Sequence, residues 1–307
     1  MSGREKRARA VPKLRQIGIT ALVNFSRWKR SPQVWLAFGL GFVACFLLSG
    51  KVMDFAQGQR TLLQLFEPFI WTFGDAHSIL LISLCLLLLF ADLPNLDNEV
   101  PLFLVRTSRA CWMAGQLLYL VLATLLFVGF ILAATCLLAG GQAFPGNMWS
   151  ETAAILGYSD IGETIAVPAF VKVLELTFPY RCAAHIFGLV LGYSLVLSAL
   201  VFFFNLLRGR LGMLAGVAFS GFGFFLTPEV IKEWLHLGAE QGRVANILFG
   251  WLSPLNHATY YMHNFGYDNL PRLGDSYLFF GGASLVVYLL AFWRVRGCGF
   301  NFTGTEQ

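Results

Sequence analysis

Two histidines that flank a tyrosine pair, His257 and His263, come closest to a metal site in this sequence. Their spacing of six residues differs from the three- or four-residue step that places two ligands on one helical face. Asp268 lies nearby in sequence, but no cysteine and no cluster of carboxylates accompanies the pair. We therefore expect no metal, and we interpret the segment as an aromatic-rich turn at the level of the lipid headgroups.

A second candidate for chemistry is the pair Asp75 and His77, which precedes the apolar run Ile79–Phe90. An ionisable group inside a membrane is by default a functional candidate, so the pair could relay protons or contact a substrate. The alternative places both residues near the outer headgroups, shortly after Trp71. We treat Asp75 and His77 as candidate gate or substrate-contact residues.

Nucleotide chemistry finds no support in the sequence. The stretch Ser49–Val52 resembles the end of a phosphate-binding loop, but the required glycine and hydroxyl positions hold Cys45 and Val52. Lys51 is better interpreted as a lysine that extends from a helix end toward the membrane surface. No nucleophile elbow, zinc-protease motif or paired carboxylates occur either, so the chain is not expected to be an enzyme or to bind a cofactor.

The stretch from Asp92 to Trp112 predicts a short amphipathic helix at the inner membrane face. Pro94 ends the preceding helix, and the acids that follow it can cap and charge a new helix start. Apolar and basic side chains then alternate in a way that a simple connecting loop does not require, which indicates a docking surface for another protein. Its candidate contact residues are Asp97, Glu99, Pro101, Phe103, Arg106 and Arg109.

The elements that must position these residues are membrane spans. The chain is 57% hydrophobic and 13% charged, against about 45–50% and about 25% in soluble domains. Long apolar runs recur throughout, so we predict an all-α polytopic membrane protein, with six transmembrane helices in a domain over residues 33–294. The expected spans are about 34–50, 71–91, 110–140, 182–207, 211–226 and 277–293. The second span must extend back through Asp75 and His77 to be long enough.

Basic residues set the expected orientation, because cytoplasmic loops carry an excess of lysine and arginine. Residues 1–30 are rich in both and hold a single acid, Glu5. With that end inside, further arginines also lie inside, namely Arg106, Arg109, Arg208, Arg210, Arg294 and Arg296. We therefore predict a multi-pass protein of the cell (plasma) membrane with both termini in the cytoplasm, ending in a cytoplasmic tail over 295–307.

The N-terminal region is expected to lie on the membrane surface. Residues 1–11 suggest a basic disordered tail, whereas apolar residues between Pro12 and Arg30 recur at steps of three and four. This pattern predicts an interfacial amphipathic helix over 12–32 that faces anionic headgroups. A basic tail that is disordered throughout is the alternative.

Two long outer segments, 141–181 and 228–276, are rich in aromatic and aliphatic residues. Loops of this length are usually structured or functional, so we expect short helices that re-enter the bilayer or rest on the outer leaflet. In the fifth span, Gly212 and Gly216 form a GxxxG pattern. This pattern favours close helix packing, either within the chain or with another subunit.

The arrangement resembles the permease (transmembrane) subunit of type-two, exporter-like ATP-binding-cassette (ABC) transporters. The residues that carry the resemblance are Val105–Arg109, Trp112 and Gly115–Gln116, which look like the family's junction from coupling helix to third span. The connection over 141–181 is longer than is usual in the family.

The resemblance implies a dimer with a second permease copy or homologue in the lipid bilayer, and no nucleic-acid partner. A separate nucleotide-binding ATPase subunit would hold ATP and Mg and push the coupling helix. The expected cargo is hydrophobic or amphipathic, such as a peptide, drug or lipid-like molecule. The alternatives are a stand-alone secondary transporter or membrane sensor that uses Asp75 and His77, and a membrane enzyme, for which no catalytic group was found.

Overall fold

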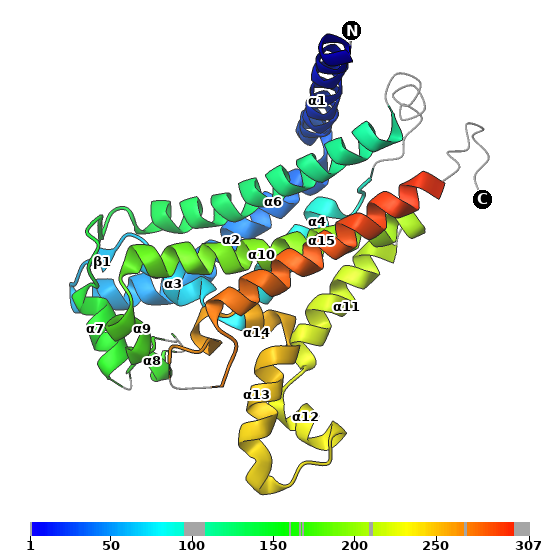
Figure 1. Cartoon of the computed structure of the whole chain (residues 1–307). Coiled ribbons are helices and arrows are strands. Elements are labelled where there is room, and N and C mark those ends of the chain that lie inside the picture. Colours follow the sequence, from blue (N-terminus) through cyan, green and yellow to red (C-terminus); the bar gives the residue numbers. More distant parts are fainter. Residues whose placement is uncertain are drawn as a thin grey trace.

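The protein is described from a computed structural model covering residues 2–94, 108–159, 161–165, 167, 169–208, 211–266 and 269–297 (Figure 1). These residues are almost wholly helical, and the strands among them are two residues long each. Strand β1 (Leu63–Gln64) pairs in parallel with β2 (Ala143–Phe144), with Leu63 opposite Ala143.

Four helices in the described part of the chain are long and apolar enough to cross a membrane. They are α2 (Pro32–Gln59), α6 (Arg109–Ala139), α10 (Pro179–Leu207) and α15 (Leu273–Gly297). Two bent pairs raise the number to six if each pair is one span: α3 (Glu67–Phe73) with α4 (Ala76–Phe90), and α11 (Leu211–Phe225) with α12 (Pro228–Trp234). The chain is therefore a helical, multi-pass membrane protein.

The expected second span, 71–91, is not continuous, because α3 and α4 meet at an angle of 89°. Gly74 ends α3, and Asp75 begins α4 as its N-cap, with its Oδ2 accepting a hydrogen bond from the backbone N–H of His77 at 3.0 Å. Tyr261 fills the break and donates from its hydroxyl to the carbonyl oxygen of Ile70 at 2.5 Å. The break therefore has three causes: a small residue, a cap and an inserted ring.

The fifth predicted span also ends in a bend of 89°, between α11 and α12. Thr227 caps α12 by accepting a hydrogen bond from Val230 N–H, and Pro228 occupies its first turn. The following segment forms the 3-10 helix η2 (Ala239–Gln241), α13 (Gly242–Leu252), α14 (Pro254–Ala258) and the 3-10 helix η3 (Tyr260–Met262). Of these, α13 projects from the bundle together with α12, whereas α14 packs against α10 and α4 (Figure 1).

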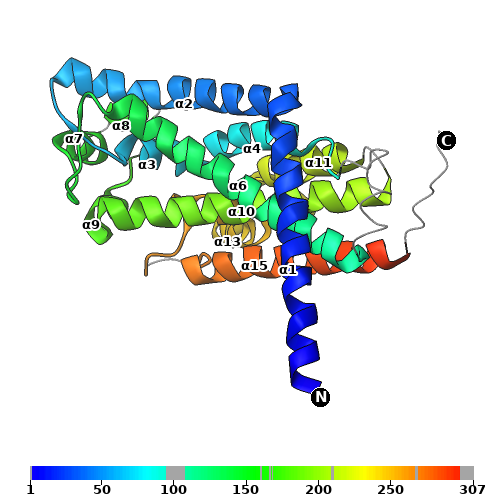
Figure 2. The ribbon, with the colours of Figure 1, turned by 90° about the horizontal axis from the view of Figure 1, so that it is seen from above.

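The N-terminal helix α1 (Ser2–Arg27) crosses over the bundle and joins α2 through the 3-10 helix η1 (Trp28–Arg30) (Figure 2). It packs on α6: Asn24 donates to Gln116 at 3.0 Å, and the Trp28 indole donates to the Tyr119 hydroxyl at 2.8 Å. Gly115 is needed there, because a Cβ would lie 2.5 Å from the Cβ of Thr20.

Helix α1 begins at Ser2, so helix also covers the residues for which the sequence predicts a disordered tail. Alanine and arginine, which are frequent in this stretch, are strong helix formers. Pro12 lies inside this helix rather than at its start. Leu14 and Leu22 of α1 are exposed on the protein surface.

The end of the bundle opposite α1 carries α7 (Glu151–Tyr158), α8 (Ile161–Thr164) and α9 (Val171–Leu176) (Figure 1). A buried carboxylate ties this region to α3. Both oxygens of Glu67 accept hydrogen bonds: Oε1 from Ser150 N–H at 2.8 Å, and Oε2 from the Ser150 hydroxyl at 2.6 Å and Gln64 N–H at 3.1 Å. Ser150 also caps α7.

Most of the expected docking surface lies outside the described residues. This applies to Asp97, Glu99, Pro101, Phe103 and Arg106. Arg109 is the first residue of α6, and Ser108 caps that helix by accepting a hydrogen bond from Cys111 N–H. The tail beyond Gly297 is likewise outside the described residues, whereas 295–297 belong to α15.

Candidate functional site

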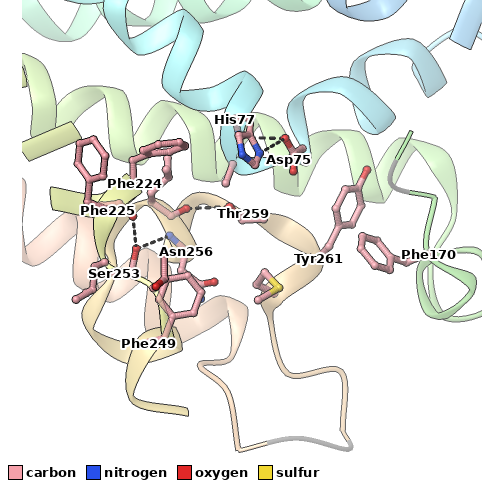
Figure 3. Close-up of a pocket in the computed structure, with 16 residues that line it drawn as sticks. Asp75, His77, Phe170, Phe224, Phe225, Phe249, Ser253, Asn256, Thr259 and Tyr261 are labelled. Carbon is pink, nitrogen blue, oxygen red and sulfur yellow. Dashed lines mark hydrogen bonds and ion pairs between the residues drawn. The ribbon is translucent and has the colours of Figure 1, made fainter. Parts of the chain in front are cut away.

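A pocket of about 420 Å³ lies where the two bent pairs face the short helices (Figure 3). Its walls come from the break between α3 and α4, the end of α11, the segment from α13 to η3, and Phe170 before α9. The residues that line it are Asp75, Ala76, His77, Phe170, Gly223, Phe224, Phe225, Leu226, Thr227, Phe249, Ser253, Leu255, Asn256, Thr259, Tyr261 and Met262.

The walls pack closely because one of them carries a glycine. A Cβ at Gly223 would lie 2.9 Å from the Cβ of Leu255, so α11 reaches α14 only without a side chain at this position. The Ser253 hydroxyl fixes the same contact by donating to the carbonyl oxygen of Gly223 at 3.0 Å. The end of α11 and the start of α14 therefore form one rigid wall.

Polar side chains on this wall already bond within the protein. Asn256 donates to the carbonyl oxygen of Gly250 at 3.2 Å, and the Thr259 hydroxyl donates to that of Leu255 at 2.9 Å. Aromatic and aliphatic groups make up most of the remaining surface. Such a lining favours an apolar or amphipathic occupant, because a charged solute would lose its hydration without gaining partners.

Among the residues that the structure describes, one carboxylate and one imidazole line the pocket, and they are the candidate residues Asp75 and His77. His77 Nδ1 lies 3.3 Å from Asp75 Oδ2, and the side chains are 76% and 33% exposed. The His77 ring also meets the edge of Phe224, with ring centroids 5.6 Å apart. Both residues thus lie at the rim, where they can contact an entering molecule.

Tyr261 joins the pocket to the break between α3 and α4. Its ring packs on Phe170, with centroids 4.8 Å apart, and its hydroxyl bonds to Ile70 O. Burial raises the pKa of the Tyr261 phenol well above its usual value, so the hydroxyl remains a donor. Both Tyr260 and Tyr261 are buried within the protein.

The sequence predicts Asp75 and His77 as candidate contact residues, but it does not predict the other residues that line the pocket. A signal for the break was present: glycine followed by aspartate, directly before an apolar run, is a helix stop followed by a helix start. Nothing in the local sequence shows that Tyr261, far along the chain, fills that break. His257 and His263 lie behind the pocket wall, where both contact Ser276.

Comparison with known proteins adds no relative to this picture. No protein-family model, no curated protein and no solved structure matches the chain. Its function must therefore be argued from its own residues.

Proposed function

We propose that the chain is the membrane-spanning permease subunit of an ATP-driven transporter of the type-two, exporter-like ABC class. Each bent pair counts as one of six spans of the cell membrane, and both termini lie in the cytoplasm. A second permease copy completes the transport path, and a separate ATPase subunit supplies energy. The cargo is hydrophobic or amphipathic.

The observation that carries the proposal is the position of α4. Its first residues, Ala76 and His77, line the pocket, and its last residue, Phe90, lies shortly before the segment proposed to dock the ATPase. A helix of 15 residues is about 22 Å long at about 1.5 Å per residue. One short rigid helix therefore runs from the pocket toward the part of the chain that leads into the proposed docking segment.

The packing of α1 supports the same mechanism. Through Asn24 and Trp28 it is bonded to the first turns of α6, which follows the docking segment directly. Gln33, just after η1, is hydrogen-bonded to Asp92, just after α4. A push on the docking segment would thus reach α1, α4 and α6 together.

A second candidate is a stand-alone secondary transporter or sensor. The observation in its favour is the Asp75–His77 pair at the rim, since carboxylate and imidazole groups can carry protons. In the ABC proposal the same pair gates the pocket or contacts cargo. These two roles differ in whether a proton gradient drives transport.

The docking segment gives a direct test of the proposal. Combining Phe103→Ala with Arg106→Glu should lower substrate-stimulated ATPase activity of the assembled transporter about tenfold, since losing one anchor side chain costs more than about 1 kcal/mol. The amount of protein in the membrane should not change. Stimulated ATPase activity is measured in proteoliposomes.

The matched control is Phe178→Ala combined with Arg181→Glu, which makes the same two changes with the same spacing at exposed positions around the start of α10. That variant should retain stimulation. Full stimulation in the Phe103→Ala, Arg106→Glu variant would rule out this segment as the coupling element.

A further inference from the structure

Three buried side chains behind the pocket wall form a continuous hydrogen-bonded chain. His257 Nδ1 lies 2.7 Å from the Ser276 hydroxyl oxygen, and His263 Nε2 lies 2.8 Å from the same atom. None of the three side chains is more than 2% exposed. Together they join α14 and η3 to the first turn of α15.

The outer nitrogen of each imidazole faces carbonyl oxygens. His257 Nε2 lies 3.0 Å from Trp251 O, while His263 Nδ1 lies 3.0 Å from Thr259 O and 3.2 Å from Tyr260 O. A carbonyl oxygen can only accept a hydrogen bond, so each of these nitrogens must carry a proton. In neutral imidazoles the two nitrogens that face Ser276 are then both acceptors.

Ser276 has a single hydroxyl proton, so it can donate to only one of those two acceptors. The other contact would set a nitrogen lone pair against an oxygen lone pair at hydrogen-bonding distance. One additional proton, on either inner nitrogen, completes every contact in the chain. The three side chains therefore need one more proton to satisfy all of their hydrogen bonds.

We propose that His257, Ser276 and His263 form a buried proton-binding site that takes up one shared proton when the surroundings become acidic. The site is argued from contacts within this chain and does not rest on the proposed transport function. Its position gives it an effect on the pocket, because Asn256, Thr259 and Tyr261 line the pocket and each lies within two residues of His257 or His263.

Burial opposes the charge and lowers the pKa of His263 to about 4, although the carbonyls of Tyr260 and Thr259 act in the opposite direction. His257 and Lys172 add repulsion at His263. Burial also lowers the pKa of His257, while Asp275 on α15 favours its charged form.

The two lowered pKa values determine how pH changes the stability of this arrangement. Both histidines bind protons more weakly in this buried arrangement than in water. The stability that the arrangement contributes is therefore fully present above the pKa of a solvated histidine, about 6.5. Acidification from there toward about 4 weakens the attachment of η3 to α15. The bond through Ser276 limits that loss, because it stabilises the protonated form.

The test is histidine-selective NMR of the full chain in detergent micelles, titrated from about pH 8 to about pH 2.5 so that a midpoint near 4 and a tenfold weaker one both fall within the range. The ring signals of His257 and His263 should shift together in one step, as expected for a shared proton. Ser276→Ala should make proton binding about tenfold weaker, since a charge-assisted hydrogen bond is lost. Ser276→Thr, which keeps the hydroxyl, should restore it.

His257→Phe provides a second variant that retains the stacking on Phe279, where the ring centroids are 4.6 Å apart. Without the His257 imidazole, the Ser276 hydroxyl can donate to neutral His263, and no contact is left unsatisfied. His263 should then take up a proton about tenfold more weakly than the pair of histidines does in the original chain. Signals of the exposed His77 and His236 serve as controls. Two independent steps in the original chain, or unchanged midpoints in Ser276→Ala and His257→Phe, would overturn the proposal.

Discussion

Gly74→Ala should destabilise the protein by about 3 kcal/mol, the sum of an overpacked core position and a lost buried hydrogen bond. A Cβ at Gly74 would overlap the Tyr261 ring and lie 2.5 Å from its hydroxyl oxygen and 2.7 Å from Ile70 O. The backbone at Gly74 is right-handed helical, with φ −74°, so the cost arises from contact and not from strain. Unfolding with SDS in mixed micelles measures the free energy.

Two comparisons separate the clash from a general helix effect. Gly39→Ala in α2 should be close to neutral or stabilising, because a Cβ there meets nothing within 4 Å. In a Tyr261→Ala background, Gly74→Ala should cost clearly less, since the ring is gone and only the contact with Ile70 O remains. Equal costs in both backgrounds would show that Tyr261 does not fill the break.

Glu67→Gln should cost about 2 kcal/mol, although it changes neither the size of the side chain nor its burial. Both oxygens of Glu67 accept hydrogen bonds, and an amide replaces one of them with a donor. Either orientation of the amide then faces an N–H or O–H group of Gln64 or Ser150. The free energy of unfolding, measured as for Gly74→Ala, tests this.

The neighbouring Glu151 supplies the matched control, because it is exposed in the first turn of α7. Glu151→Gln should change stability by less than about 0.5 kcal/mol. A double-mutant cycle of Glu67→Gln with Ser150→Ala should give a coupling of about 1–2 kcal/mol. Independent, additive effects would mean that the carboxylate does not hold α3 to α7.

Apolar run length predicts the bounds of two of the long helices closely. The expected span 110–140 corresponds to α6, Arg109–Ala139, and 182–207 corresponds to α10, Pro179–Leu207. In these helices the length of the apolar run predicts the helix bounds, because a spanning helix needs about 20 apolar residues to cross the hydrocarbon core. Helix α15 extends beyond its expected span at both ends, since charged residues such as Asp275 and Arg294 are compatible with helix outside the apolar region.

Contacts between distant segments could not be predicted in this way. The break at Gly74 depends on Tyr261, nearly two hundred residues later, and an apolar count treats Phe73 and Ala76 as one run. Likewise, the spacing of His257 and His263 argues against a shared helical face, yet both meet at Ser276 because α14 and η3 are separate short helices. Residue spacing within one stretch of the sequence does not predict contacts of this kind.

The central claim is that ATP, and not a proton gradient, powers transport through this chain. The measurement is uptake of an amphipathic fluorescent dye into inside-out vesicles that contain the permease and its ATPase, with and without ATP and with and without an imposed proton gradient. The account predicts uptake that requires ATP, continues when the gradient is removed, and persists in Asp75→Asn. Uptake that follows the gradient without ATP and is abolished by Asp75→Asn would contradict it.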